Sequence, residues 1–193
     1  MPSALTEHFI GFLYGEVYES INLSPKNREL VLMAGLIAMG DKTAELNVHI
    51  NGALNSGWTA VEIQEAMLQM SVYSGLPSSV NGMNTLKEVL GQRKQRGITD
   101  VTNPPLASKQ KTGKSKLEVG SKQLEKLQVI DAKALQEAYK DVSPNFAKHV
   151  IEYAFGDILS RPALDYQTRE MITGFPSMAN ATNALKEVLN ERK

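Results

Sequence analysis

The chain has 193 residues, enough for one good core or two small ones, and its 21 basic side chains balance its 21 acidic ones. This balance gives no electrostatic reason to expect a nucleic-acid partner, and the absence of cysteine excludes disulfides, thiolate metal sites and thiol redox chemistry within the chain. No apolar stretch is long enough to span a bilayer, and the first residues show no signal-peptide pattern, so we expect a cytoplasmic protein without a membrane partner.

The first part of the chain predicts two helices. Residues 4–19 place apolar side chains three and four apart, which is the spacing of one helix face. Ser24-Pro25 is a strong helix start, because a hydroxyl caps the first turn and proline fits its first position. The helix that follows, through Met39, is apolar nearly all round. Such a helix needs burial in a core or against another subunit.

Three more helices are expected before the middle of the chain. They cover about residues 42–55, 59–73 and 77–94. Asp41 is the expected N-cap of the first of them. Thr59 and Glu62 form a capping-box pattern at the start of the second.

Residues 95–118 predict a linker, because they contain Pro104-Pro105, two glycines, a lysine-rich run and little apolar content. A basic run can bind nucleic acid, but no aromatic residue interleaves with this one, so a solvated linker is favoured. Helices are expected again over about 121–141 and 144–160, and from 165 to the end. No run alternates with period two between turn signals, and the predicted fold class is therefore all-α.

One motif occurs twice, and its second copy lacks the middle. Residues 14–30 (YGEVYESINLSPKNREL) match residues 155–171 (FGDILSRPALDYQTREM) at an offset of 141. Residues 75–94 match residues 174–193 at an offset of 99, so the second copy has no counterpart of Met33–Ser74. We therefore expect a complete unit in residues 1–94, a linker in 95–118, and a shortened second unit in 119–193. The shortened unit would pack on the first or on another subunit.

His49 is the histidine best placed for chemistry, and only the first copy carries it. Glu45 lies four residues earlier on the same helix face. Glu29 comes from the preceding helix, which must pack antiparallel after a short turn, so it can face the same pocket. A carboxylate beside imidazole suits proton transfer near neutral pH, and Lys42 can supply positive charge for a carboxylate ligand. Two alternatives remain: His49 is a buried, hydrogen-bonded structural residue, or Glu45 and His49 form a surface pair.

No metal site is expected. The other histidines, His8 and His149, occupy equivalent positions in the two copies, which suggests a structural role, and no metal-ligand motif surrounds His49. Arg28 and Arg169 each precede the glutamate of the repeat. We expect them to form buried ion pairs that fix helix packing rather than to bind substrate.

Two stretches carry a family resemblance: GEVYESINLSPKNRELVLMAGLIAMG, and then ELNVHINGALNSGWTAVEIQEAMLQMSVYSGLPSSVNGMNTLKEVL. The glycine-acidic turn, the arginine-glutamate pair that opens an apolar helix, and the histidine followed by alanine-leucine and glycine resemble the carboxymuconolactone decarboxylase family of the alkylhydroperoxidase D-like superfamily. The resemblance covers residues 9–94 almost continuously. Residues 120–173 resemble the front part of another copy, as in tandem members of the family.

The resemblance implies an all-helical homo-oligomer, a trimer or hexamer, with sites near subunit contacts. For the decarboxylase members it implies cofactor-free loss of CO2 from γ-carboxymuconolactone, a small carboxylate, with no metal. Its histidine and helix-opening glutamate fall on His49 and Glu29. The cysteines of the peroxidase branch fall on Lys42 and Glu45. Thiol peroxidase activity is therefore excluded here, even if the chain carries the peroxiredoxin name of that branch. The alternative is a non-catalytic oligomeric protein that binds small molecules.

Overall fold

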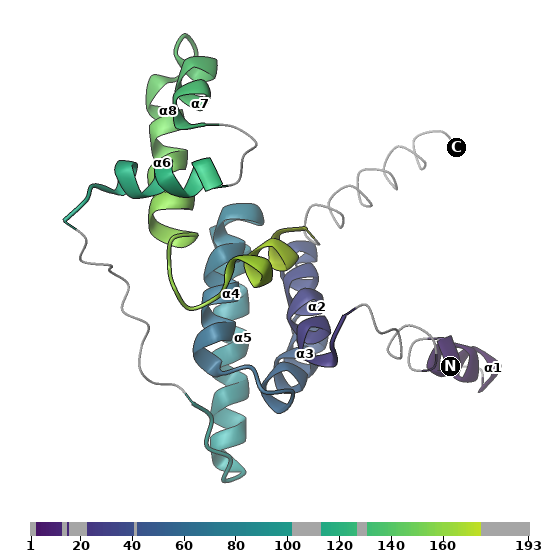
Figure 1. Ribbon diagram of the computed structural model, residues 1–193. Helices are drawn as coiled ribbons and strands as arrows, with labels where there is room; N and C mark the ends of the chain where they lie inside the picture. Colours follow the sequence, from purple (N-terminus) through teal and green to yellow (C-terminus); the bar gives the residue numbers. More distant parts are fainter. Residues whose placement is uncertain are drawn as a thin grey trace, which may run out of the picture.

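The computed structural model describes residues 3–12, 15, 23–40, 42–101, 113–126 and 131–174. Its labelled elements are α1 (Ser3–Ile10), α2 (Pro25–Met39), α3 (Thr43–Asn55), α4 (Ala60–Tyr73), α5 (Leu76–Gln95), α6 (Lys116–Lys126), α7 (Ala132–Tyr139), α8 (Pro144–Val150) and the π-helix η2 (Ile151–Ile158) (Figure 1). A further helical segment covers residues 166–174. The described residues contain no strand, and the predicted all-α fold class is confirmed. The predicted N-cap Asp41 and most of the C-terminal motif lie outside the described residues.

Two predicted helix starts are confirmed by their hydrogen bonds. The Ser24 hydroxyl accepts a 3.2 Å bond from the backbone N–H of Asn27 at the start of α2. At the start of α4, the Thr59 hydroxyl accepts from the Glu62 backbone at 3.2 Å, while the Glu62 carboxylate accepts from the Thr59 backbone at 2.8 Å. Each cap satisfies backbone donors that the first helical turn leaves without partners.

The structure corrects three of the predictions for the second half. Helix α6 begins at Lys116, inside the predicted linker, because Ser115 and Glu118 form a reciprocal capping pair at 3.2 and 2.8 Å. The helix predicted over 121–141 is two helices, α6 and α7. The second starts afresh because the Asp131 carboxylate accepts a 2.6 Å bond from the backbone of Ala134. The helix predicted over 144–160 is α8 followed by η2.

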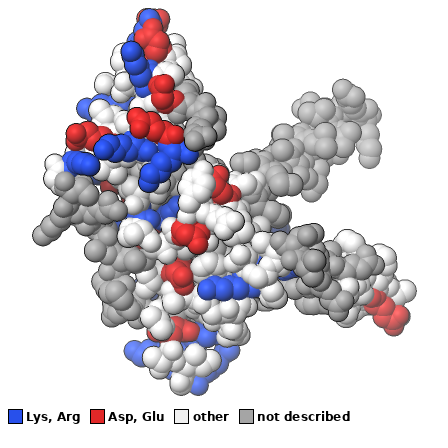
Figure 2. Space-filling view, viewed as in Figure 1, with Lys and Arg blue, Asp and Glu red and all other residues white. Residues whose placement is uncertain are grey.

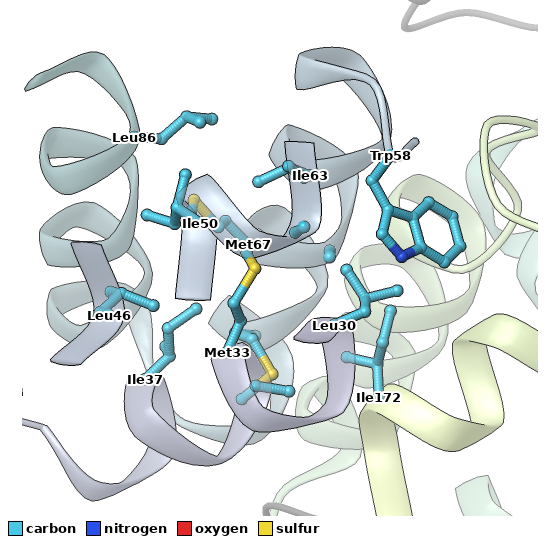
Figure 3. Close-up of a cluster of buried hydrophobic side chains, with 14 of the residues drawn as sticks. Leu30, Met33, Ile37, Leu46, Ile50, Trp58, Ile63, Met67, Leu86 and Ile172 are labelled. Carbon is cyan, nitrogen blue, oxygen red and sulfur yellow. The ribbon is translucent and has the colours of Figure 1, made fainter. Parts of the chain in front are cut away.

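Helices α2, α3, α4 and α5 pack together around one apolar core. Its completely or almost completely buried side chains include Leu30, Met33, Ile50, Ile63, Met67 and Leu86 (Figure 3). Ile172, from the helical segment 166–174, lies beside Leu30 and is fully buried in the same core. The later part of the chain therefore closes one side of the core that the first four helices build.

A tight crossing holds α6 against η2. A Cβ atom added at Gly120 would lie 2.2 Å from the Ile151 carbonyl oxygen, and one added at Gly156 would lie 2.4 Å from that of Lys116. Real side chains cannot approach backbone this closely, so the crossing requires glycine at both positions. Figure 1 shows α6 lying across the column formed by α8 and η2.

Residues 159–174 are joined to α4 by buried polar contacts. The Gln69 side-chain amide donates to the Arg169 carbonyl at 2.8 Å and to the Thr173 hydroxyl at 2.9 Å. Arg161 donates two bonds, of 2.6 and 2.7 Å, to the Glu65 carboxylate, which is 4% exposed. Arg169 itself is buried and lies 3.8 Å from Glu65. The predicted role of Arg169 in a buried ion pair is thus observed, with a partner from α4 that the sequence did not indicate.

No helix in the ranges that the structure describes is both long enough and apolar enough to cross a membrane.

Candidate functional site

The centre of the candidate site is a hydrogen-bonded pair formed by His49 on α3 and Glu29 on α2. The distance from His49 Nδ1 to Glu29 Oε2 is 2.8 Å, and the side chains are 24% and 14% exposed. Because an ionised carboxylate only accepts, Nδ1 carries the proton in this bond and Nε2 is left for other contacts. The structure therefore brings together two of the residues predicted from sequence.

Glycine at position 52 makes room for the Glu29 carboxylate. A Cβ atom added at Gly52 would lie 2.6 Å from Glu29 Oε2 and 2.8 Å from its Cδ. Gly52 is one helical turn after His49, so both residues present the same face of α3 to Glu29. Gly52 is not among the site residues predicted from the sequence. A glycine inside a helix destabilises it by about 1 kcal/mol relative to alanine, and that was the available signal.

The start of α2 fixes the position of Glu29 relative to His49. Glu29 lies in the second turn of α2, whose start is fixed by the Ser24 cap. The preceding residue, Arg28, is buried and its Nε donates to the Leu23 carbonyl at 2.8 Å. This bond ties the start of α2 to the chain before it, so that Glu29 projects toward α3 from a rigid turn.

Helix α3 is held from its other side by Arg93 of α5. This buried guanidinium donates to Asn55 at 2.9 Å and to Asn51 at 3.3 Å, while it forms a two-pronged ion pair with Asp100. Such fork-shaped contacts fix geometry as well as adding energy. They hold the α3 turn that carries Gly52 against α5.

Glu45 and Lys42 lie apart from the observed hydrogen bond. Glu45 is exposed on the first turn of α3, and the His49 Nδ1 bond goes to Glu29 instead. Lys42 is half-buried at the N-cap position of α3 and makes no side-chain capping bond. It lies two helical turns before His49, on the same side of the helix. The described residues thus leave Lys42 a candidate ligand contact and favour Glu29 as the carboxylate that orients the imidazole.

The other histidines lie elsewhere. His8 on α1 and His149 on α8 are both exposed, and the His149 ring stacks on Tyr153 with centroids 6.3 Å apart. Within the described residues, no three histidine or acidic side chains gather closely enough to hold a metal ion.

The pair can hold and move one proton. Glu29 fixes the imidazole tautomer and stabilises the imidazolium, while Nε2 can give a proton to a substrate or take one from it. The side chains are mostly buried yet open to solvent at one edge, so the imidazole can regain its proton from water. This arrangement suits acid–base chemistry on a small molecule.

Comparison with known proteins relates the first half of the chain to decarboxylases. The model of the carboxymuconolactone decarboxylase family matches residues 3–88, which include Glu29, Lys42, Glu45 and His49. The chain is similar to a 4-carboxymuconolactone decarboxylase of Acinetobacter baylyi, with 38% identity over 84 residues, which are 43% of this chain and 62% of the relative. It is also similar to a nitrosuccinic acid decarboxylase of Metarhizium robertsii, with 34% identity over 84 residues, which are 44% of this chain and 58% of the relative. The chain thus spans about six tenths of the length of these two relatives.

Proposed function

We propose that this protein decarboxylates a small carboxylic acid without a cofactor, with His49 as the general acid and Glu29 as the residue that orients it. The observation that carries the proposal is the 2.8 Å bond between His49 Nδ1 and Glu29 Oε2. Two similar proteins named as decarboxylases support the reaction class.

The proposed step needs only a placed carboxylate and one proton. The bond between the carboxylate carbon and its neighbour breaks, CO2 leaves, and the electron pair stays on the remaining carbon. His49 then donates the proton from Nε2 to that carbanion, which forms the new C–H bond. Glu29 stabilises the imidazolium before the transfer, and water returns the proton afterwards. A positioned general acid raises the rate of such a step by about 10²- to 10⁴-fold.

The substrate class follows from what the carbanion requires. A protein that supplies one proton and no electron sink needs a substrate that delocalises the negative charge itself. The conjugated carbonyl of a carboxylated unsaturated lactone and the nitro group of nitrosuccinate both do this. Lys42 would bind a second carboxylate of such a substrate, since it lies two turns before His49 at the positive end of α3.

The proposal includes a homo-oligomer, a trimer or hexamer as the family resemblance implies. Val48, beside His49, is 66% exposed, and Leu76 and Val80 on α5 are 61% and 53% exposed. An exposed apolar side chain next to a candidate site, as Val48 is, fits a surface that another copy covers. The alternative is that the protein is non-catalytic: it would bind small carboxylates at the same site without releasing CO2.

The test is CO2 release from γ-carboxymuconolactone and from nitrosuccinate by the wild-type protein, His49→Ala and His149→Ala. We expect turnover of at least one substrate, a loss of about 100-fold or more in His49→Ala, and full activity in His149→Ala, because His149 is an exposed histidine on another helix. Equal activity in all three proteins would refute the role of His49. Saturable binding with no CO2 from the folded wild-type protein would favour the binding protein.

A further inference from the structure

A cavity of about 500 Å³ lies between α6 and residues 159–169. Its size falls within the range of small-molecule sites, roughly 300–1,000 Å³. Five cationic side chains line it, namely Lys114, Lys122, Lys126, Arg161 and Arg169. No carboxylate is among the described residues that line it, although the whole chain carries equal numbers of basic and acidic residues. Figure 2 shows Lys and Arg side chains over the region of α6, with Asp and Glu side chains beside them.

The acidic groups around this cavity only partly offset its charge. Glu65 lies on α4 and is paired with Arg161 in a two-pronged contact, and its carboxylate is 3.8 Å from Arg169. Glu118 is near Lys114 and Lys122, but it is exposed and its carboxylate is held by Ser115 at the start of α6. Asp157 also acts on Arg161, but it is paired with Lys116 at 2.5 Å. The side chains that line the cavity therefore give it an excess of positive charge.

One buried cationic group in the lining is incompletely satisfied. Arg169 is 3% exposed; its Nη1 donates to Gln69 and its Nη2 to the Arg161 carbonyl, each at 2.8 Å. Its Nε has no hydrogen-bond partner among the described residues. Burial also lowers the pKa of Arg169, because the charged guanidinium has lost its water. In folded proteins a buried N–H group is rarely left without an acceptor.

The rest of the lining suits an organic anion. Ser160 and Gln123 are the neutral polar groups of the lining. The Ser160 hydroxyl donates to the Gly156 carbonyl at 2.7 Å, while the Gln123 amide donates to the Leu159 carbonyl at 3.1 Å and accepts from Lys126 at 3.2 Å. Val119, Leu159 and Tyr166 supply an apolar wall. A few polar and charged groups placed on a partly apolar surface are the usual composition of a small-molecule site.

We propose that this cavity binds a small polyanion carrying phosphate or several carboxylate groups, at a site distinct from the His49–Glu29 pair. The anion would lie between the lysines of α6 and the arginines of residues 161–169, all of which line the cavity. Guanidinium groups match the geometry of phosphate and carboxylate oxygens, and lysines add positive charge. This proposal stands on the second half of the chain and does not depend on the decarboxylase activity.

Calorimetric titration of the full chain with pyrophosphate and with citrate tests the proposal and separates the two chemistries. We expect saturable one-to-one binding of at least one of them. Lys122→Glu should weaken it by about tenfold or more, because the change replaces attraction with repulsion in the cavity. Lys148→Glu makes the same change of charge on the exposed surface of α8 and should leave the affinity within about twofold. Circular dichroism checks that both variants are folded.

A second measurement on the wild-type protein needs no variant. The NMR signal of the Arg169 Nε–H group should shift on addition of the bound probe. That of Arg28, whose Nε already donates to the Leu23 carbonyl, should not. The proposal is overturned if neither probe binds saturably, if both lysine variants weaken binding equally, or if the Arg169 signal stays unmoved at saturation.

Discussion

Replacing Gly52 with alanine should separate Glu29 from His49 without touching either residue. The added Cβ atom would lie 2.6 Å from Glu29 Oε2, so this oxygen must retreat by about 0.8 Å to reach an ordinary contact of 3.4 Å. The same oxygen accepts the 2.8 Å bond from His49 Nδ1. A movement of this size away from the ring stretches the bond beyond useful length.

Two opposing energies decide the stability of Gly52→Ala. Alanine inside a helix is favoured over glycine by about 1 kcal/mol. Loss of a hydrogen bond to a charged group costs about 1.5–3 kcal/mol. The expected net effect is a loss of roughly 0.5–2 kcal/mol in the free energy of unfolding, together with a fall in decarboxylation toward the rate of a Glu29 variant.

Gly91 supplies the matched control. It is a helical glycine on the exposed side of α5, and a Cβ atom added there meets nothing within 4 Å. Gly91→Ala should therefore stabilise the protein by up to about 1 kcal/mol and leave activity unchanged. The background variant Glu29→Ala removes the clash, so Gly52→Ala should become stabilising in that background.

Urea unfolding at one fixed protein concentration measures stability, and CO2 release measures activity. The wild-type protein, Gly52→Ala, Glu29→Ala and the double variant form a cycle that gives the coupling energy between positions 52 and 29. Gly52→Ala should destabilise the wild-type protein and stabilise the Glu29→Ala variant. Equal stabilisation by Gly52→Ala with and without the Glu29 carboxylate would refute this prediction, because the two side chains would then not compete for space.

Two further predictions concern the second half of the chain. Gly120→Ala places a Cβ atom 2.2 Å from the Ile151 carbonyl oxygen, which is backbone and cannot rotate away, so a loss of about 1–3 kcal/mol or more is expected in thermal unfolding; an unchanged melting temperature would mean that α6 and η2 do not cross this closely. The hydrogen bond from the Thr168 backbone lowers the pKa of Asp165 below its ordinary value of about 3.9. The charged form therefore stabilises the fold above that value, and this contribution is lost as the pH falls through the folded pKa. In urea unfolding, the stability gap between the wild-type protein and Asp165→Asn should narrow from pH 7 to pH 3; a constant gap would contradict the assignment.

Local signals in the sequence were sufficient for most of the first half. The caps at Ser24 and Thr59 depend only on residues three positions away, so their effect can be read without knowing the fold. Ser115 and Glu118 carry the same signal at the start of α6. The predicted linker nevertheless included Ser115 and Glu118, because the stretch before them is rich in proline and lysine.

The choice between two carboxylates could not be made from spacing. Glu45 is four residues from His49 along one helix, whereas Glu29 lies twenty residues away on another helix. The decision depends on how closely α2 approaches α3, and Gly52 sets that approach. The buried contacts of Arg161 and Arg169 with Glu65 and Gln69 span nearly one hundred residues. No periodicity in the sequence marks pairs at such separations.

The most direct test of the Glu29–His49 pair compares Glu29→Gln with Glu45→Gln in the decarboxylation assay. Both variants remove one carboxylate near His49 and keep the size of the side chain. We predict that Glu29→Gln lowers kcat by about 100-fold while Glu45→Gln stays near the wild-type rate, since only Glu29 holds the imidazole at Nδ1. A folded Glu29→Gln variant with full activity, or a larger loss in Glu45→Gln, would contradict the account.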